Sequence, residues 1–586
     1  MISRIPIFGP VAILLLAAAS ACSSSAPETR PPLAASEVEF PASWRYSGLT
    51  EAVRADSGMV VSTDSLASAA GLEILRAGGN AIEAAIATSF ALAVVNPAAG
   101  NIGGGGFMVA RLADDTRFAL DYREEAPGAA TADMYVDAEG RVTDKGVRGH
   151  LASGVPGSVA GLEAAYVRYG QLPWARLLEP SIRLARDGFE IADRHYSSIR
   201  STREKLSQFP VSAATFLPRG EPPEVGSTFQ QPYLARTLQA IADGGAAAFY
   251  RGWIADSLTA EMRRGGGLIS REDLAAYEAV WRDPVRAEYR GYEVLSMPPA
   301  SSGGTTLTQI LNIVEGFDLQ ASGWHSAESI HLAVEAMRRA YADRNYYLGD
   351  TDFVDVPLDM LTSESYADSL RSSIDMNQAS VSEDFNRVPV ESENTTHLSV
   401  VDASGNAVAV TTTLNSGFGS GVVVRGAGFT LNNEMDDFTS RVGVPNLYGL
   451  VQGEANAIAP GKRMLSAMTP TIVINPQGRT ELVTGTPGGA TIITTVFQIV
   501  TNHIDFGLPV QTSVNAPRFH HQHLPDLIRY EKNGLSESVI DELRALGHEV
   551  SERGGISGNV ESIYIAPDGT LFGGADPRRD SKALGY

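Results

Sequence analysis

Residues 394–415 read Asn-Thr-Thr-His-Leu-Ser-Val-Val-Asp-Ala-Ser-Gly-Asn-Ala-Val-Ala-Val-Thr-Thr-Thr-Leu-Asn, which is the pattern of a β-hairpin. Two runs rich in Val and Thr, residues that favour strands, flank Ala403-Ser404-Gly405. A three-residue hairpin loop commonly has glycine at its left-handed position. We therefore expect Asp402 and Asn406 to face each other across this loop.

Counting outward from the loop fixes which side chains meet at the open end of the hairpin. His397 faces Thr411, Thr395 faces Thr413, and Asn415 lies one step further on the same face of the sheet. A shift of one residue would move the whole set to the other face, so the grouping depends on the turn.

The chain before Thr395 has a different character. Residues 377–394 are rich in Ser, Asp, Glu and Asn, as in an exposed segment. The threonines alone are explained by their β propensity. If the Asn394–Thr395 bond were cut, however, Thr395 would carry a free α-amine, whose unperturbed pKa of about 7.7–8.0 suits a general base. This would activate a hydroxyl that is otherwise a poor nucleophile.

Composition narrows the class of protein. The chain has 586 residues, a net charge of −22 and no run of basic residues, which argues against a nucleic-acid surface. Its one cysteine excludes a disulfide framework. No internal repeat is visible, and the length allows a single large layered unit.

The N-terminal residues resemble an export signal. Arg4 precedes a short apolar run at 11–19, and Cys22 follows small residues as in a bacterial lipoprotein box. We expect residues 1–22 to be a signal, Cys22 to be lipidated and 23–45 to be a flexible tether. The protein would then be periplasmic or at the cell surface, with a lipid anchor as its only link to a membrane. Ala19 stands where such boxes usually have Leu, so ordinary secretion is the alternative.

Periodicity predicts the other elements. Two helices are expected within 62–95, separated by Ala77-Gly78-Gly79-Asn80, and strands at 107–112 and up to Arg123. Residues 160–345 are expected to be mostly helical, and strands with turn signals dominate after 395. This segregation indicates an α+β fold with sheets between helix layers. One apolar helix face is formed by Ile330, Val334, Met337 and Tyr341.

Several motifs, in order along the chain, resemble the γ-glutamyltranspeptidases, a family of self-cleaving N-terminal-nucleophile hydrolases. The resemblance runs from about residue 52 to 586. It implies a four-layer αββα sandwich formed jointly by a heavy chain, 46–394, and a light chain, 395–586. Besides the hairpin, the motifs are Asn101 to Phe107, Asp121 to Glu124, Asn432 to Phe438, Gly443 to Asn446, Thr484 to Gly489 and Asn515 to His521.

The resemblance also implies catalytic roles. Thr395 would attack first the Asn394 carbonyl and later the γ-carbonyl of a substrate, with Thr413 bonded to its hydroxyl. The N–H groups of Gly488 and Gly489 would form the oxyanion hole. Taken alone, the Pro487-Gly488-Gly489 stretch is typical of an ordinary turn.

A γ-glutamyl group carries both an α-carboxylate and an α-ammonium, so a site that recognises it needs a cationic and an anionic side chain. By resemblance, Arg123 binds the α-carboxylate with help from Ser466, and Asn415, Glu434 and Asp437 bind the α-ammonium. From the sequence alone, Arg123 could equally be a surface arginine paired with Glu124 or Glu125, and the acidic run a solvated turn.

One position departs from the family pattern. Ala467 replaces the second of two serines, which removes a hydroxyl donor to the substrate carboxylate. Residues 439–450, with Pro445 and Tyr448, match a lid loop that excludes water and favours transfer over hydrolysis.

No cofactor is expected. The histidines of His520-His521-Gln522-His523 lack the spacing of a metal motif, and the glycines at 103–106 lack the Lys-Ser/Thr of a phosphate loop.

We expect a self-processed γ-glutamyltransferase that acts on glutathione or a related donor, with amino acids, peptides or water as acceptors. The alternatives are a glutaryl or cephalosporin-type acylase of the same fold and a lipid-anchored binding protein that does not mature.

Overall fold

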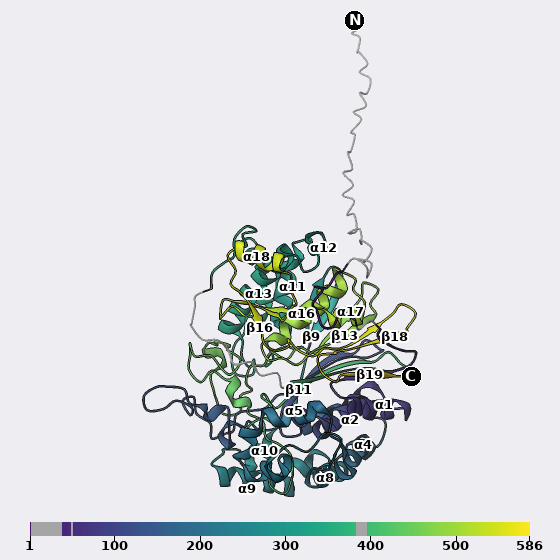
Figure 1. The fold of residues 1–586 in the computed structure, drawn as a ribbon, viewed down its shortest axis with the longest axis vertical. Coiled ribbons are helices and arrows are strands. Elements are labelled where there is room, and N and C mark those ends of the chain that lie inside the picture. The colour runs from purple at the N-terminus through teal and green to yellow at the C-terminus, as the bar shows by residue number, and fades with distance from the viewer. Residues whose placement is uncertain (2–37, 49–50, 383–394) are drawn as a thin grey trace.

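Two large antiparallel sheets lie face to face between two layers of helices (Figure 1). The structure is a computed structural model, and it describes residues 1, 38–48, 51–382 and 395–586. Cys22, the signal and Asn394 lie outside the described residues. Within the described part, no helix is both long and apolar enough to span a bilayer.

The first sheet has seven strands and contains the hairpin at its centre. Their order is β19 (Lys582–Gly585), β2 (Met59–Ser62), β10 (Thr395–Val401), β11 (Ala407–Thr413), β3 (Gly105–Arg111), β4 (Arg117–Tyr122) and β7 (Val280–Arg282).

The second sheet also has seven strands. Their order is β1 (Val53–Ala55), β18 (Leu571–Ala575), β17 (Glu561–Ile565), β13 (Thr480–Thr484), β12 (Thr471–Ile474), β9 (Tyr292–Ser296) and β8 (Val285–Tyr289). Both sheets combine strands from before and after Thr395, so neither part of the chain could complete a sheet alone.

One group of helices packs on the outer face of the first sheet, and α1 and α2 lie directly below it in Figure 1. The group comprises α1 (Ser65–Arg76), α2 (Ala81–Val95), α3 (Ser158–Tyr169), α4 (Trp174–Asp187), α5 (Asp193–Ser201), α6 (Arg203–Ser207), α7 (Pro210–Phe216), α8 (Pro232–Tyr250), α9 (Trp253–Gly265) and α10 (Arg271–Ala276).

A second group of helices covers the second sheet from above in the same view. It comprises α11 (Gly303–Glu315), α12 (Leu319–Ser322), α13 (Ala327–Tyr347), α14 (Leu358–Leu361), α15 (Glu364–Arg371), α16 (Thr491–Ile504), α17 (Val510–Asn515) and α18 (Glu537–Ala545). Smaller sheets pair β5 (Phe189–Glu190) with β6 (Thr228–Phe229), and β14 (Phe519–His520), β15 (Ile528–Glu531) and β16 (Val550–Arg553) with one another.

Alternation along β10 explains how the hairpin joins the layers. Leu398 and Val400 pack into the core beneath the first sheet, against the helices. His397 and Ser399 point the other way, toward the second sheet, where the Ser399 hydroxyl donates to the Glu561 carbonyl at 2.9 Å. The polar face predicted for this strand is therefore buried between the two sheets.

The predicted hairpin register is confirmed. Thr395 pairs with Thr413 and His397 with Thr411, and Gly405 in the loop has a φ of +85°. His397 Nδ1 lies 2.8 Å from the Thr411 hydroxyl, which holds the two strands together at this position.

The α+β class and the two helices within 62–95 are confirmed. Gly78, between these helices, has a φ of +89°, and the Asn80 side chain caps α2. The predicted helix face at 330–341 is buried in α13.

The expectation of a mostly helical segment at 160–345 missed the two-residue strands β5 and β6 and the strands β7, β8 and β9. Residues 285–289 alternate between buried and more exposed positions, as a half-buried strand does. A two-residue turn with positive φ at Arg290 and Gly291 joins β8 to β9.

Candidate active site

The open end of the hairpin places two threonine hydroxyls side by side. The Thr395 hydroxyl lies 3.5 Å from that of Thr413, and both side chains are buried. The Asn415 main-chain N–H also donates to the Thr413 hydroxyl, at 2.8 Å. Asn415 has a φ of +77°, a conformation that asparagine tolerates better than most residues. This kink turns the chain back over the threonine pair.

A pocket of about 350 Å³, part of it open to solvent, lies beside these threonines. Most of the residues predicted for the site line this one pocket: Arg123, Thr395, Thr413, Asn415, Glu434, Asp437, Tyr448, Ser466 and Gly489, together with Ala467. Gly488 and Pro445 are not among the lining residues, but each is next in the chain to one that is, Gly489 and Asn446 respectively.

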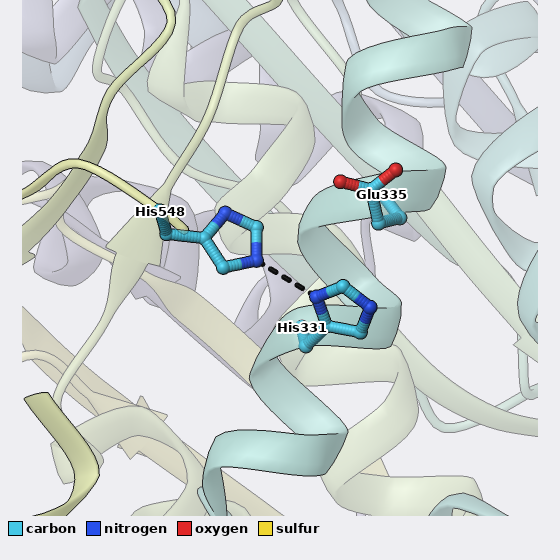
Figure 2. A group of neighbouring side chains, drawn as sticks. All are labelled: His331, Glu335 and His548. Carbon is cyan, nitrogen blue, oxygen red and sulfur yellow. Dashed lines mark hydrogen bonds between the residues drawn. The ribbon is translucent and has the colours of Figure 1, made fainter. Parts of the chain in front are cut away.

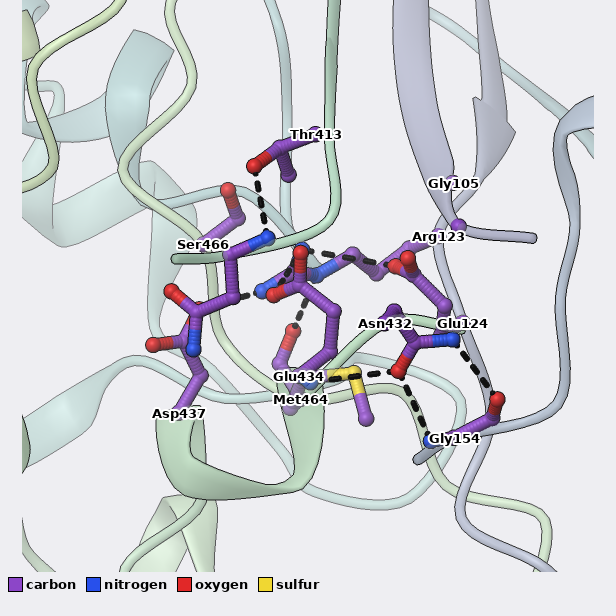
Figure 3. A network of polar contacts seen from close by, with 12 residues as sticks. Gly105, Arg123, Glu124, Gly154, Thr413, Asn432, Glu434, Asp437, Met464 and Ser466 are labelled. Atoms are coloured by element: carbon purple, nitrogen blue, oxygen red, sulfur yellow. Dashed lines mark hydrogen bonds and ion pairs between the residues drawn. The ribbon is translucent and has the colours of Figure 1, made fainter. Parts of the chain in front are cut away.

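Arg123, just after β4, is completely buried, so its reading as a surface arginine is wrong (Figure 3). Its Nη1 lies 2.7 Å from Glu434 Oε2 and 3.4 Å from Glu124 Oε2, and its Nη2 lies 2.5 Å from Asp437 Oδ2. Its Nε donates to the Met464 carbonyl at 3.2 Å. One guanidinium thus faces three carboxylates.

The acidic run forms a short 3-10 helix, Glu434–Asp437, in which Glu434 and Asp437 are buried. The reading as a solvated turn is therefore wrong. Neither oxygen of Glu434 accepts a well-directed hydrogen bond within the described residues, despite the nearby guanidinium. Such a group is costly to bury unless something further pairs with it.

Burial raises the carboxyl pKa values in this cluster. Desolvation holds the pKa of Glu434 well above its usual value and also raises that of Asp437, with Arg123 acting in the opposite sense. The pKa of Glu124 rises to about 7 for the same reason. The cluster has more negative groups than its single arginine neutralises, so it can accept another cation.

Gly488 and Gly489 connect β13 to α16 and have φ values of +142° and +58°. A Cβ on Gly489 would lie 2.4 Å from the Tyr448 ring, and one on Gly488 would lie 2.5 Å from the Thr491 hydroxyl. These positions therefore require glycine. Within the described chain neither main-chain N–H donates a hydrogen bond. Both stand just before the N-terminus of α16, where an anion is favoured.

The loop at 439–450 lies against the site. The Tyr448 hydroxyl donates to the Asn415 carbonyl at 2.8 Å, and the Tyr448 ring contacts Gly489. Pro445 pairs with Val451 in an isolated bridge at the base of the loop. Tyr448 thus links the loop to both the hairpin end and the glycine pair.

The segment after β4 and the segment before β12 form the opposite wall. The Ser466 hydroxyl accepts from the Met468 N–H at 3.1 Å, and the Ser466 carbonyl accepts from Ser302. The methyl group of Ala467 lines the pocket next to Ser466. Ala467 brings no hydroxyl to this wall of the pocket.

From the sequence, Glu124 was expected only as a surface partner of Arg123, and Arg344 was missed. Glu124 is a third carboxylate on Arg123, and Arg344 lines the pocket from α13. The signal for Arg344 was available, since it lies three residues after Tyr341 on the apolar face of the predicted helix. A charged residue on such a face needs an explanation.

A second cluster could hold a metal ion by proximity alone (Figure 2). Among the described residues, His331, Glu335 and His548 form the one group of this kind. His331 Nδ1 lies 2.8 Å from His548 Nε2, and His331 Nε2 lies 2.9 Å from the Asp375 carbonyl. These contacts occupy both ring nitrogens of His331 and the Nε2 of His548 without an ion.

Glu335 is also fully occupied. One oxygen accepts from Arg338 and the Ser380 N–H, and the other accepts from Arg339 and the Ser380 hydroxyl. Two guanidinium groups on the one carboxylate oppose a divalent cation. The cluster instead holds the chain near Ser380 to α13.

Two of the three histidines at 520–523 take part in side-chain hydrogen bonds of their own. His520 Nδ1 lies 2.8 Å from the Thr494 hydroxyl, and His521 Nε2 lies 3.1 Å from Asp526 Oδ1.

Comparisons with known proteins bear on this arrangement. A family model described as gamma-glutamyltranspeptidase matches residues 67–586. The chain belongs to this family. A glutathione hydrolase proenzyme of Escherichia coli (strain K12) is 48% identical over 582 residues, which cover 98% of each chain.

Two proteins named as acylases are also similar. An acylase ACY 1 proenzyme of Pseudomonas sp. (strain SE83) is 39% identical over 530 residues, 89% of this chain and 92% of that protein. The crystal structure of a cephalosporin acylase from Bacillus halodurans superposes with a TM-score of 0.82 at 30% identity, covering 94% of this chain and 99% of that one. The similarity extends through both sheets and both helix layers.

Proposed function

We propose that this protein is a glutathione hydrolase proenzyme that matures into a γ-glutamyltransferase. The observation that carries the proposal is the pairing of Thr395 and Thr413, 3.5 Å apart, in one pocket with the acid-rich Arg123 cluster. The 48% identity to a glutathione hydrolase proenzyme over nearly the whole chain supports the same substrate class.

The first reaction in this proposal is self-cleavage. The Thr395 hydroxyl attacks the Asn394 carbonyl, and the peptide bond becomes an ester as the Thr395 nitrogen leaves and takes a proton. Water then hydrolyses the ester, which gives a heavy chain ending at Asn394 and a light chain starting at Thr395. Because both sheets contain strands from both sides of the cut, the two chains would remain together as a heterodimer.

The mature enzyme would work by a two-step transfer. The free α-amine of Thr395 takes the proton from the Thr395 hydroxyl, which attacks the γ-carbonyl of the donor. The N–H groups of Gly488 and Gly489 stabilise the oxyanion. The leaving amine takes the proton, and a γ-glutamyl ester remains on Thr395. An amino acid, a peptide or water then attacks this ester and regenerates the hydroxyl.

Recognition follows from the charges around the pocket. Arg123, with Ser466, binds the α-carboxylate of the γ-glutamyl group, and Asn415, Glu434 and Asp437 bind its α-ammonium. The ammonium supplies the cation that the three carboxylates lack, and it lowers their pKa values again. No cofactor takes part in these steps.

The lid and the N-terminal signal complete the proposal. Tyr448 and Pro445 belong to a lid whose closure excludes water and favours amine acceptors.

In the same proposal, residues 1–22 direct export, Cys22 is lipidated, and the tether at 23–45 leaves the enzyme in the periplasm or at the cell surface. Incorporation of labelled palmitate that is lost in Cys22→Ala tests the anchor.

An acylase acting on glutaryl or cephalosporin-type amides is the second candidate. The TM-score of 0.82 to a cephalosporin acylase and the missing hydroxyl at Ala467 favour it. A glutaryl substrate lacks the α-ammonium, however, and would leave Glu434 and Asp437 with Arg123 as their shared cationic partner. The carboxylate cluster therefore favours a γ-glutamyl donor.

Two experiments test the proposal. On a denaturing gel, protein expressed without residues 1–22 should appear as two fragments, and Thr395→Ala as one intact chain. Folded wild-type protein that stays intact would contradict self-cleavage and favour a binding protein that does not mature.

The second experiment compares substrates. Release of nitroaniline from a γ-glutamyl anilide but not from a glutaryl anilide is expected, and the reverse preference would make the protein an acylase.

A further inference from the structure

Two buried arginines line the pocket, and their surroundings differ. Arg123 lies within ion-pair distance of Glu124, Glu434 and Asp437. Arg344 lies within ion-pair distance of no carboxylate among the described residues, although only 1% of its surface is exposed. A buried cation without an anion is unfavourable, so a residue of this kind is a candidate to bind one.

The contacts of Arg344 leave part of its guanidinium unused. Nε donates to the Ser302 hydroxyl at 2.9 Å, and Nη1 contacts the side-chain oxygens of Asn345 and Gln452 at 3.1 and 3.4 Å. Nη2 donates no hydrogen bond within the described part of the chain. Burial lowers the pKa of Arg344 to about 10, with Tyr341 and Asp437 acting in the opposite sense, so the group is charged at neutral pH.

These contacts tie Arg344 to two residues of the proposed γ-glutamyl site. Ser302 accepts from Arg344 and donates to the Ser466 carbonyl at 2.6 Å. Gln452 accepts from Arg344 and donates to the Asp437 main-chain carbonyl at 3.0 Å. Arg344 is therefore held at the wall where a hydroxyl is missing at Ala467.

We propose that Arg344 is a second carboxylate-binding residue of the pocket, which binds the α-carboxylate of the γ-glutamyl donor together with Arg123. This inference rests on the proposed function. The physical reason is the division of charge. Glu434 and Asp437 lie within ion-pair distance of Arg123, whereas Arg344 has no carboxylate that close among the described residues and is influenced by Asp437 only from further away. A guanidinium can donate two parallel N–H bonds to a carboxylate, so it binds this group more specifically than a lysine ammonium would.

The competing explanation is structural. Through Gln452, Arg344 could simply hold the base of the lid loop, and its loss would then impair every substrate alike. The two explanations differ for a donor that has the α-ammonium but lacks the α-carboxylate. The 4-aminobutyryl anilide is such a donor and the γ-glutamyl anilide is its complete counterpart.

The test compares Arg344→Met, Arg344→Lys and wild type, each as the self-processed enzyme, on both anilides. We expect Arg344→Met to lower kcat/KM for the γ-glutamyl anilide by about 10- to 100-fold, mainly through KM, and for the 4-aminobutyryl anilide by less than about 3-fold. Arg344→Lys keeps the positive charge but loses the planar pair of N–H donors. Its loss of kcat/KM should be intermediate and should again be confined to the γ-glutamyl anilide.

Arg371→Met is the matched control, because it removes an arginine that donates to the main-chain carbonyls of Ile313 and Asn312, outside the pocket. It should not change the ratio of the two kcat/KM values. An equal loss on both anilides in the Arg344 variants would overturn the inference. If Arg344→Met does not fold, the Lys variant decides by the same ratio. A wild-type enzyme that releases no nitroaniline from the γ-glutamyl anilide would contradict the proposed function itself.

Discussion

Two buried charge clusters in this protein have opposite balances. Around Glu335, one carboxylate accepts hydrogen bonds from two arginines and from Ser380, and its pKa is lowered to about 2 against the cost of burial. Around Arg123, one arginine faces three carboxylates whose pKa values are raised by burial. The first cluster is complete without a ligand, whereas the second has more carboxyl groups than cationic partners among the described residues.

The difference separates stabilising groups from binding groups. A buried pair with every partner present stabilises the fold, and breaking it costs several kcal/mol. A cluster with surplus carboxylates destabilises the unliganded protein, and a ligand that supplies the missing charge recovers that free energy. The central charged group is buried in both clusters, so the balance of charges around it carries the functional information.

The largest effect is expected from Asp437→Asn. Because Arg123 keeps Glu434 and Glu124 as partners, the unfolding midpoint should change little, whereas kcat/KM for a γ-glutamyl anilide should fall about 100-fold or more. Steady-state kinetics and urea unfolding measure the two quantities. The control is Glu125→Gln, a neighbouring acid that pairs with Arg463 outside the pocket. Equal losses of kcat/KM in both variants would show that Asp437 is not a binding group in the sense used here.

Glu335→Gln should show the opposite pattern. Removing this carboxylate leaves Arg338 and Arg339 without their shared partner, so the free energy of unfolding should fall by about 3 kcal/mol. Urea unfolding in the uncleaved Thr395→Ala background measures it on a single chain. The kcat/KM of the processed Glu335→Gln enzyme should stay within about 2-fold of wild type. Glu328→Gln, an exposed acid on the same helix, is the control, and an equal loss there would refute the assignment.

The two clusters should also respond oppositely to pH. The folded-state pKa of Glu335 is depressed to about 2, so its stabilisation is present above its usual pKa near 4.5 and is lost as pH falls toward 2. The folded-state pKa of Glu124 is raised to about 7, so its folded form holds a proton longer, and stability is lost as pH rises from 4.5 to 7.

Each of these contributions is of the order of 1–3 kcal/mol. Unfolding midpoints measured between pH 2 and 8 test them. Glu335→Gln should flatten the acid side of the profile and Glu124→Gln the neutral side. Profiles that flatten on the same side in both variants would show that the clusters are not opposite in kind.

The smallest effect is expected from Ala467→Ser. A hydroxyl restored beside Ser466 adds one hydrogen bond to the substrate α-carboxylate, and kcat/KM for the γ-glutamyl anilide should rise about 3- to 10-fold. The 4-aminobutyryl anilide lacks that carboxylate and should show no gain. A gain on both anilides would place the hydroxyl somewhere other than at the carboxylate.

The sequence predicted the hairpin well because a turn fixes its register. Once Gly405 takes the left-handed position, the pairing of Thr395 with Thr413 follows by counting. The convergence of Arg123 with Glu434 and Asp437 does not follow from local pattern, because more than 300 residues separate them. Only the family motifs brought these residues together before the structure did.

What could not be predicted is the balance of charges. Composition showed that acids outnumber bases, but not that Glu124 and Glu434 would be buried on one arginine. The strands at 285–296 were missed because their short alternation lies among long helices. Arg344 was missed because no motif marks it, although its place on an apolar helix face was visible.

The most direct test of the central claim is to trap the acyl-enzyme. The processed protein is mixed with a γ-glutamyl anilide, quenched with acid during turnover and analysed by mass spectrometry. We expect a light chain that begins at Thr395 and carries one γ-glutamyl group on that residue. A light chain with another N-terminus, or a γ-glutamyl group on any other residue, would contradict it.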